Sequence, residues 1–445
     1  MKHVKQKIII IMLMAIATMF LSACLRITAD ELYSLPQVSE EYLKLQRHLN
    51  AVLNQGAEFA PPTTGPNRQA VQLVDINGDS INEVIAFFKL PGDSPLKVYI
   101  FKNTGNDYVE AEVISGEGAE FDSVRYVDMD GDGVSEIIIG RKMGDTLKHM
   151  SIYSIKDFNS VLLTGEEYTG ITIYDLNGDF HDDIITLRLS QEAGAVARVF
   201  SLMRDGEIVK AETRLSSRIE TISRVLAGKL IDGTPAIFVE SEGKYDEGTL
   251  VTDICIYKDG SFDNISLKRP SGISEGTVRQ YYQSADINKN GIIKVPMPKL
   301  LKAQSDTPYH AVDWYAYDCK GRSSLALTTY HNNNDGWFLI LPFDWRGKVT
   351  VRREDAVSGE RTIVFSYFAY ANGPYEDFLK IHKLTGDNAE ERSALPNRSL
   401  LMSDGAAVYA FELLVPPNSF GLTLDETLIK DNFRLIYSDW LMGTI

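Results

Sequence analysis

The chain has 445 residues, which is enough for two or three domains. Hydrophobic residues make up 44% of it, so sizeable cores can form, and the formal net charge is −16. Binding to nucleic acid needs basic surface against the phosphates, so this acidity argues against nucleic acid as a partner. Three cysteines are too few for a disulfide framework.

The first 24 residues have the layout of an export signal. Three lysines lie within the first seven residues, an apolar run spans residues 8–20, and the sequence Leu-Ser-Ala-Cys occupies positions 21–24. A basic start, an apolar stretch and a small-residue cleavage site are typical of a secretory signal peptide. The run is shorter than the roughly 20 residues that a membrane-spanning helix prefers.

The segment Leu-Ser-Ala-Cys resembles the bacterial lipobox, a resemblance that covers only the first 24 residues. It implies that residues 1–23 are a removed signal peptide and that the Cys24 thiol carries a diacylglycerol. The protein would then be extracytoplasmic and anchored to the bacterial cell membrane by lipid, at about 0.8 kcal/mol per buried CH₂. A plain secretory signal and a single membrane-spanning helix are the alternatives.

A tether and one helix follow the cysteine and complete the segment 24–64. Residues 25–38 are the predicted tether; Ser39 can cap a helix, Glu40 suits its positive end, and Gly56 can terminate it. The apolar face of this helix comprises Tyr42, Leu45, Leu49 and Val52. We expect this face to pack against the domain that follows.

An acidic segment then repeats along the chain. Three copies carry oxygen-bearing side chains at positions 1, 3, 5 and 9: Asp75, Asn77, Asp79 and Glu83; Asp128, Asp130, Asp132 and Glu136; Asp175, Asn177, Asp179 and Asp183. A weaker fourth copy has Asp286, Asn288, Asn290 and Lys294. The starts lie 53, 47 and 111 residues apart, and residues 228–239 near the middle of the last gap look like a degenerate copy. A period of about 50 residues indicates a repeat architecture.

Short apolar runs flank each copy and predict β-strands. In the first three repeats the predicted strands are 70–74, 84–88, 96–101 and 108–114; 124–127, 137–139, 150–155 and 161–163; 171–174, 184–187, 197–202 and 207–211. Runs this short, bounded by Gly, Asp and Asn, disfavour helical repeats. Four strands per repeat of about 50 residues are typical of a β-propeller blade.

The acidic segments resemble the Asp-x-Asn/Asp-Gly-Asp-Gly-x-x-Asp/Glu signature of FG-GAP and VCBS repeats, which form propellers in integrin α chains and bacterial surface proteins. The resemblance covers about residues 65–330 and implies a mainly β fold with a propeller of about five four-stranded blades.

Strands predicted at 337–341, 349–352, 362–368 and 378–382 lack acidic loops. With a capping-box pattern at 423–426 before Ile429, Phe433 and Ile436, they predict a C-terminal α+β domain at 331–445. The alternative is a seven-bladed propeller reaching the C-terminus.

The repeated segments have the composition of calcium loops. Ca²⁺ takes six to eight oxygen ligands on a flexible loop, and Gly78, Gly131 and Gly178 allow a sharp turn that aims positions 1, 3 and 5 at one centre. An EF-hand is excluded because position 12 is not Glu and a strand follows. The copy at 128 has the most acidic residues and ranks first; the copy at 286 is predicted to bind no metal. Plain Asx-turns are the alternative.

No catalytic motif stands out, so we predict no catalytic residues. Gly272-Ile-Ser-Glu-Gly276 matches the G-x-S-x-G pattern, but it lies in a polar loop rather than between a strand and a helix. Cys255 lies in an apolar run and is predicted to be a core residue, with a bridge to Cys319 as the alternative. Several aromatic residues gather between 280 and 345, as core or as a binding surface: Tyr281, Tyr282, Trp314, Tyr315, Tyr317, Trp337 and Trp345.

The prediction is therefore a non-catalytic, lipid-anchored protein whose Ca²⁺-binding propeller repeats bind a protein or glycan partner. The alternative is a surface hydrolase that acts on glycan or peptide with carboxylates in the propeller funnel. Converging, poorly solvated carboxylates on the central axis would favour the enzyme. Fold alone does not decide between the two.

Overall fold

A computed structural model of the chain describes residues 40–436, apart from 146, 191–193, 245–247, 305–306, 356, 371–372 and 406. The predicted signal peptide, Cys24 and the tether lie outside the described residues. Within the described part, no helix is both long and apolar enough to cross a membrane.

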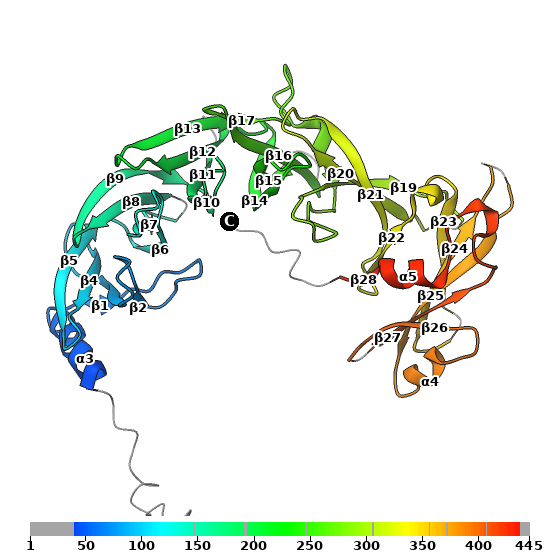
Figure 1. Cartoon of the computed structure of the whole chain (residues 1–445), viewed down its shortest axis with the longest axis horizontal. Coiled ribbons are helices and arrows are strands. Elements are labelled where there is room, and N and C mark those ends of the chain that lie inside the picture. Colours follow the sequence, from blue (N-terminus) through cyan, green and yellow to red (C-terminus); the bar gives the residue numbers. More distant parts are fainter. Residues whose placement is uncertain are drawn as a thin grey trace, which may run out of the picture.

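The described chain is mainly β and forms six sheets, whose paired strands all run antiparallel (Figure 1). The first three sheets contain β1 (Glu58–Phe59), β2 (Val71–Val74), β3 (Glu83–Lys89), β4 (Leu96–Asn103) and β5 (Tyr108–Gly116); β6 (Glu120–Val127), β7 (Glu136–Lys142), β8 (Lys148–Lys156) and β9 (Asn159–Tyr168); β10 (Gly170–Tyr174), β11 (Asp183–Ser190), β12 (Gly194–Leu202) and β13 (Ile208–Arg214). The twelve strands predicted in the three repeats all overlap these elements. In each sheet they pair in chain order, as a meander.

The fourth sheet contains β14 (Ile219–Lys229), β15 (Pro235–Gly243), β16 (Thr249–Lys258), β17 (Ser261–Asn264) and β18 (Arg279–Gln280). The degenerate copy at 228–239 comprises the end of β14, the tight turn at 230–234 and the start of β15. Like the acidic segments, it connects two neighbouring strands of one sheet, but the connection is shorter.

The fifth sheet contains β19 (Val295–Leu300), β20 (His310–Tyr317), β21 (Ser323–Asn332), β22 (Trp337–Leu341) and β28 (Phe433–Leu435), in that order. A domain boundary after residue 330 would fall inside β21, and β22 pairs with β21 from Thr328 to Asn332. Strands on both sides of the expected boundary therefore share one hydrogen-bonded sheet, because the short turn at 333–336 returns the chain directly.

The sixth sheet has the order β23 (Val349–Glu354), β24 (Glu360–Tyr367), β25 (Glu376–Thr385), β27 (Ala407–Leu413) and β26 (Ser399–Asp404). Two short helices accompany it, α4 (Ala389–Ser393) and α5 (Glu426–Asn432), with 3₁₀ turns η3 (Phe343–Trp345) and η4 (Ser419–Gly421). The cap of α5 is Asp425, which accepts a hydrogen bond from the Leu428 N–H at 2.8 Å, rather than Thr423 as predicted. The helix also ends before Phe433, which belongs to β28.

Alternate residues of β7 and β11 face opposite neighbouring sheets. Ile137 and Ile139 of β7 pack with the first sheet, whereas Ile138 between them packs with the third. In β11, Ile185 faces the fourth sheet and Ile184 faces the second. Such strands are buried on both faces, which explains why they are continuous apolar runs rather than alternating ones. These core clusters thereby join the first four sheets in sequence.

The sheets follow one another along an arc (Figure 1). In the first four sheets the first strand lies toward the inside of the arc and the last of the meander toward the outside, as with β6 and β9. The helix α3 (Glu40–Leu53) lies at one end of the arc and covers the face of the first sheet that points away from the second, where Leu45, Leu49 and Val52 pack on the core. Tyr42, predicted on the same face, is exposed.

Candidate functional site

The three acidic segments form adjacent loops between β2 and β3, between β6 and β7, and between β10 and β11. We call residues 75–83, 128–136 and 175–183 the first, second and third acidic loops, and residues 286–294 the fourth. The Ser135 N–H donates to the Ile76 carbonyl at 2.9 Å, joining the second loop to the first. A side chain at Gly131 would collide with the ring of His181, which joins the second loop to the third. The loops therefore stand in a row.

Left-handed backbone at positions 4 and 6 produces the turn in every loop. Position 4 is Gly78, Gly131 and Gly178, with φ of 73°, 72° and 80°, and the fourth loop has Lys289 at 56°. Position 6 is also left-handed, at Ser80, Gly133, Phe180 and Gly291, with φ of 67°, 88°, 71° and 79°. The sequence pointed to position 4 through its glycines. It did not point to position 6, because only two of the four residues there are glycine.

Side chains at positions 1, 3 and 5 hold the turn through backbone N–H groups. Asp128 accepts hydrogen bonds from the Gly131 and Gly133 N–H groups, at 2.8 and 3.0 Å. Asp75 and Asp175 accept the corresponding pairs in their loops. These contacts are the Asx-turns of the alternative hypothesis, so they are compatible with a loop that binds metal and with one that does not.

The carboxylates at position 9 of the first two loops distinguish better between a calcium loop and a plain Asx-turn. Glu83 and Glu136 are both 0% exposed, and one oxygen of each, Oε2, accepts a backbone N–H from its own loop, at 3.4 and 3.1 Å. The other oxygen of each, Oε1, is buried and has no hydrogen-bond partner in the described chain. Burial, with the neighbouring aspartates, raises the pKa of Glu136 to about 7. Buried carboxyl oxygens are normally satisfied, and a bound cation would satisfy these.

The second loop gathers the tightest cluster of carboxylates. Ligand atoms of Asp128, Asp130 and Glu136 all lie within 4.8 Å of one another. Lys156, the last residue of β8, pairs with Asp130 at 3.5 Å and with Asp132 at 2.8 Å. The ranking of the loops by their acidic residues did not include this lysine. The antiparallel strand pairing brings the end of β8 back to the second loop, which places Lys156 beside the aspartates.

The third loop is closed differently. Asp183 is one methylene shorter than Glu and is 2% exposed. Its Oδ2 accepts the Leu176 N–H at 2.9 Å, and its Oδ1 accepts the Ser201 hydroxyl. Burial raises the pKa of Asp183 to about 6. Because both carboxyl oxygens have partners, this loop is less prepared for a cation than the first two.

The fourth loop contains a cation of its own. The Lys294 side chain is 3% exposed, and its ammonium donates to Asn288 Oδ1 at 2.7 Å, Asn290 Oδ1 at 2.9 Å and the Ile292 carbonyl at 2.8 Å. Asp286 lies 3.7 Å away. These oxygens come from positions 1, 3, 5 and 7, and the first three of these positions are the predicted metal ligands in the other loops. Lysine at position 9 thus reaches the centre that a metal would occupy.

The remaining sequence candidates have structural roles. Ser274 of the G-x-S-x-G pattern is 0% exposed, lies just before the 3₁₀ turn η2 (Glu275–Thr277), and donates to Asp253 at 2.5 Å. It lacks the strand-to-helix setting of a nucleophile. Cys255 and Cys319 are both free thiols, and Cys255 is buried as predicted.

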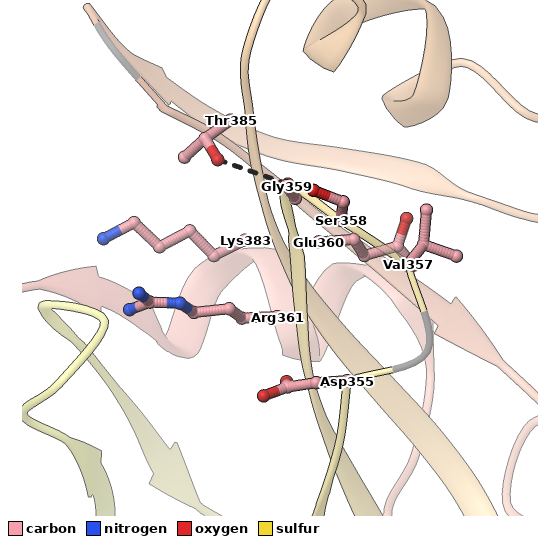
Figure 2. Close-up of a pocket in the computed structure, with 8 residues that line it drawn as sticks. All are labelled: Asp355, Val357, Ser358, Gly359, Glu360, Arg361, Lys383 and Thr385. Carbon is pink, nitrogen blue, oxygen red and sulfur yellow. Dashed lines mark hydrogen bonds between the residues drawn. The ribbon is translucent and has the colours of Figure 1, made fainter.

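A surface pocket of about 550 Å³ lies on the sixth sheet, where Arg361 and Lys383 project to the same side (Figure 2). Arg361 pairs with the Asp335 carboxylate at 2.9 Å, and the Lys383 ammonium donates to the Asp335 carbonyl at 3.0 Å. The nearby Asp355 pairs with Arg353 at 2.6 Å. Because these charged groups already have partners, none of the three is positioned to act as a catalytic acid or base.

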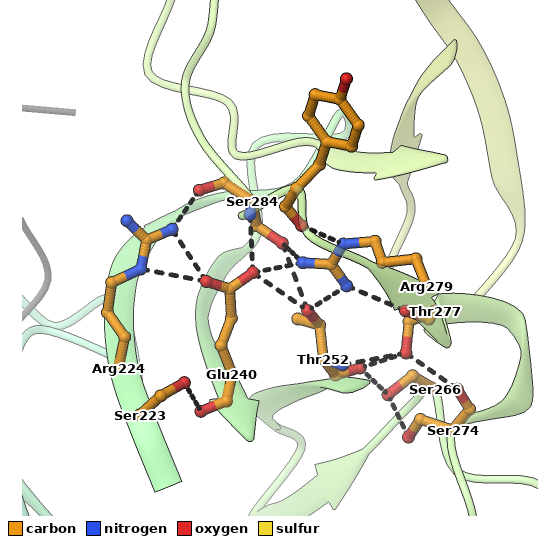
Figure 3. A network of polar contacts seen from close by, with 10 residues as sticks. Ser223, Arg224, Glu240, Thr252, Ser266, Ser274, Thr277, Arg279 and Ser284 are labelled. Carbon is orange, nitrogen blue, oxygen red and sulfur yellow. Dashed lines mark hydrogen bonds and ion pairs between the residues drawn. The ribbon is translucent and has the colours of Figure 1, made fainter. Parts of the chain in front are cut away.

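A buried polar network lies in the fourth sheet (Figure 3). Glu240 is 0% exposed and is paired with both Arg224 and Arg279. Arg279 also donates to the hydroxyl groups of Thr252 and Ser284 and to the Thr277 carbonyl. Glu240 is thus neutralised on two sides and is poorly suited to act as a catalytic acid or base.

Comparison with known proteins supports the repeat. The model of the FG-GAP-like repeat family matches residues 75–139, which span the first two acidic loops. No curated protein matches the chain. Solved structures with some likeness include a putative 6-phosphogluconolactonase from Bacteroides fragilis, at 10% identity and a TM-score of 0.25 over 78% of this chain and 92% of that one. The exotype rhamnogalacturonan lyase YesX has the same identity, TM-score and coverage of this chain, which spans 62% of the lyase. Likeness this low carries no argument about activity.

Proposed function

We propose that this protein is a non-catalytic, lipid-anchored extracytoplasmic lipoprotein that binds a protein or glycan partner. Its sheets act as β-propeller-type blades, and Ca²⁺ in the acidic loops fixes the first three of them. Residues 1–23 are its signal peptide, and Cys24 carries the lipid. The family match over residues 75–139 supports the repeat.

The observation that carries the calcium proposal is the state of position 9. In the first two loops it is a fully buried carboxylate with one unpartnered oxygen. In the fourth loop it is a lysine whose ammonium contacts the oxygens of positions 3, 5 and 7. The same loop therefore encloses a cation when the chain supplies one. Oxygen ligands on a flexible loop suit Ca²⁺ rather than a transition metal.

Ca²⁺ would act as a structural ion in these loops. Asp128, Asp130 and Glu136 would hold it in the second loop, with the corresponding residues in the first and third. The ion would neutralise like charges that otherwise repel one another and would pin the turn between two strands. No substrate or reaction is required for this role.

Thermal unfolding of residues 25–445 with EDTA, Ca²⁺ or Mg²⁺ tests the proposal. A ligand that binds only the native state raises its melting temperature, so Ca²⁺ should stabilise the protein by several degrees and Mg²⁺ should not. Asp130→Ala should remove much of this increase, because it deletes a buried ligand of the second loop. Asn288→Ala should leave the increase unchanged, because the fourth loop contains Lys294. No increase in the parent protein, or equal losses in the two variants, would contradict the calcium proposal.

A further inference from the structure

An uncharged aromatic pocket lies beside the buried network of the fourth sheet. Its volume is about 370 Å³, and its lining includes Tyr281, Tyr282, Gln283, Trp314, His331 and Asn333. The first three follow β18 of the fourth sheet, whereas the others belong to β20, β21 and the turn after β21 in the fifth. The pocket therefore joins two sheets, a common setting for small-molecule sites.

None of the lining residues carries a charge near neutral pH. His331 is the lining residue whose ordinary pKa lies closest to neutral pH, and burial lowers its pKa to about 3. The chain as a whole carries a formal charge of −16. An uncharged pocket on such an acidic protein offers no ion-pair partner, and it therefore suits an electrically neutral ligand.

Tyr281 presents its ring largely to solvent. Its side chain is 77% exposed, yet its backbone is left-handed, with φ of 66°. That conformation is unfavourable for a bulky residue and persists where the surroundings impose it. Gly248 makes room for the ring, because a Cβ there would lie 3.0 Å from the Tyr281 Cε1. The result is an exposed aromatic face next to Gly248, at the edge of the pocket.

The buried network of Figure 3 also holds the backbone that follows Tyr281. Arg279 Nε donates to the Tyr282 carbonyl at 2.7 Å, and the Ser284 N–H donates to Glu240 Oε1 at 2.6 Å. Arg224 donates to the Ser284 carbonyl. Buried ion pairs are expensive to desolvate and are weak contributors to net stability. In this network the ion-paired residues hold the backbone of Tyr282 and Ser284, on both sides of Gln283. A pre-organised binding site needs such supporting contacts.

Two amides add hydrogen-bonding capacity to the pocket. Gln283 Oε1 is buried and has no hydrogen-bond partner in the described chain. Asn333 is exposed at the turn after β21. Each amide carries both a donor and an acceptor, as recognition of hydroxyl groups requires. Aromatic rings with neutral amides match a ligand that has an apolar face and a polar rim.

We propose that this pocket binds a neutral sugar ring of a glycan. Tyr281 stacks on the apolar C–H face of the sugar, and the amides of Gln283 and Asn333 contact its hydroxyl groups. Tyr282 and Trp314 form the aromatic wall behind it. This inference rests on the proposed partner-binding function and narrows its partner class to a glycan.

Isothermal titration calorimetry with named neutral oligosaccharides tests the inference. The probes are cellohexaose, maltohexaose, xylohexaose, mannohexaose and chitohexaose, each titrated into residues 25–445 at millimolar concentration. At least one should bind. Tyr281→Ala should weaken that binding by about tenfold or more, as loss of a stacking contact worth about 1.4 kcal/mol would do. Tyr281→Phe should retain it, and Gln283→Ala should weaken it.

Tyr370→Ala is the matched control, because Tyr370 is a 64% exposed tyrosine outside the pocket. It should bind the sugar as the parent does. Binding by none of the five probes, or equal binding by Tyr281→Ala and the parent, would overturn the glycan assignment. Neither result would alter the Ca²⁺-dependent melting temperature, so the calcium proposal and the glycan proposal can fail separately.

Discussion

At the scale of single residues, position 9 of the repeated loops shows how one side chain sets the chemistry of a shared backbone. Glu83 and Glu136 extend a carboxylate oxygen into the loop without a partner. Asp183 is shorter and is satisfied by Ser201, whereas Lys294 brings its own positive charge. The first two loops should therefore bind Ca²⁺ more tightly than the third, a ranking that a count of acidic residues does not produce.

His331 should make the protein less stable in mild acid. Burial lowers its pKa to about 3, below the ordinary value of 6.5, so between those values the unfolded chain binds the extra proton. Stability is then lost as pH falls through 6.5 toward 3, by up to about 2 kcal/mol between pH 6.5 and pH 5. His331→Phe keeps an aromatic ring but cannot titrate. Its unfolding free energy in guanidinium should fall less over this range than that of the parent; an equal fall would refute the assignment.

At the scale of secondary-structure elements, the strands were predictable and the contacts between them were less so. The predicted strand 137–139 lies inside β7 because an apolar run bounded by polar turns can be found locally. Asp425 and Thr423 are both competent caps, so only the folded chain distinguishes them. The Lys156 contact with Asp132 depends on the strand pairing that brings the end of β8 to the second loop. The periodicity of the sequence does not predict which residues this pairing brings together.

The fourth acidic loop should be convertible into a calcium site. Its backbone already has left-handed positions 4 and 6, and its oxygens already surround the Lys294 ammonium. Lys294→Glu combined with Asn290→Asp would restore acids at positions 5 and 9. Calorimetry should then detect one more Ca²⁺ per chain than in the parent.

The control for that experiment is Lys289→Glu combined with Asn290→Asp. It changes the net charge by the same amount but leaves Lys294 in the loop. It should bind no additional Ca²⁺. An additional ion in the control, or none in the conversion variant, would show that the loop does not respond to the residue at position 9.

At the scale of the whole molecule, the anchor determines where the protein acts. If Cys24 carries the lipid, Cys24→Ser should move the protein from the membrane fraction into the soluble fraction, because the acyl chains supply the membrane affinity. Detergent partitioning of the parent and the variant measures this directly. A Cys319→Ser variant should stay with the membrane. Unchanged partitioning of Cys24→Ser would refute the lipobox assignment.

The first four sheets are stacked so that consecutive sheets share a core cluster, and this should limit how far Ca²⁺ stabilises the fold. Cluster residues link the first sheet to the second, the second to the third and the third to the fourth. In such arrays stability is set by each unit and its nearest interfaces, and parts of the structure open separately. The acidic loops of the first three sheets contact one another.

Hydrogen exchange should therefore slow in part of the molecule when Ca²⁺ is added. We expect amides of residues 75–83, 128–136 and 175–183 and their flanking strands to exchange about tenfold more slowly or better. Amides of β23, β24 and β25 in the sixth sheet should be unaffected, and Asp130→Ala should lose the effect in the second loop. Equal slowing in the sixth sheet would mean that the six sheets unfold as one cooperative unit, and that an ion bound at one end of the arc stabilises the other.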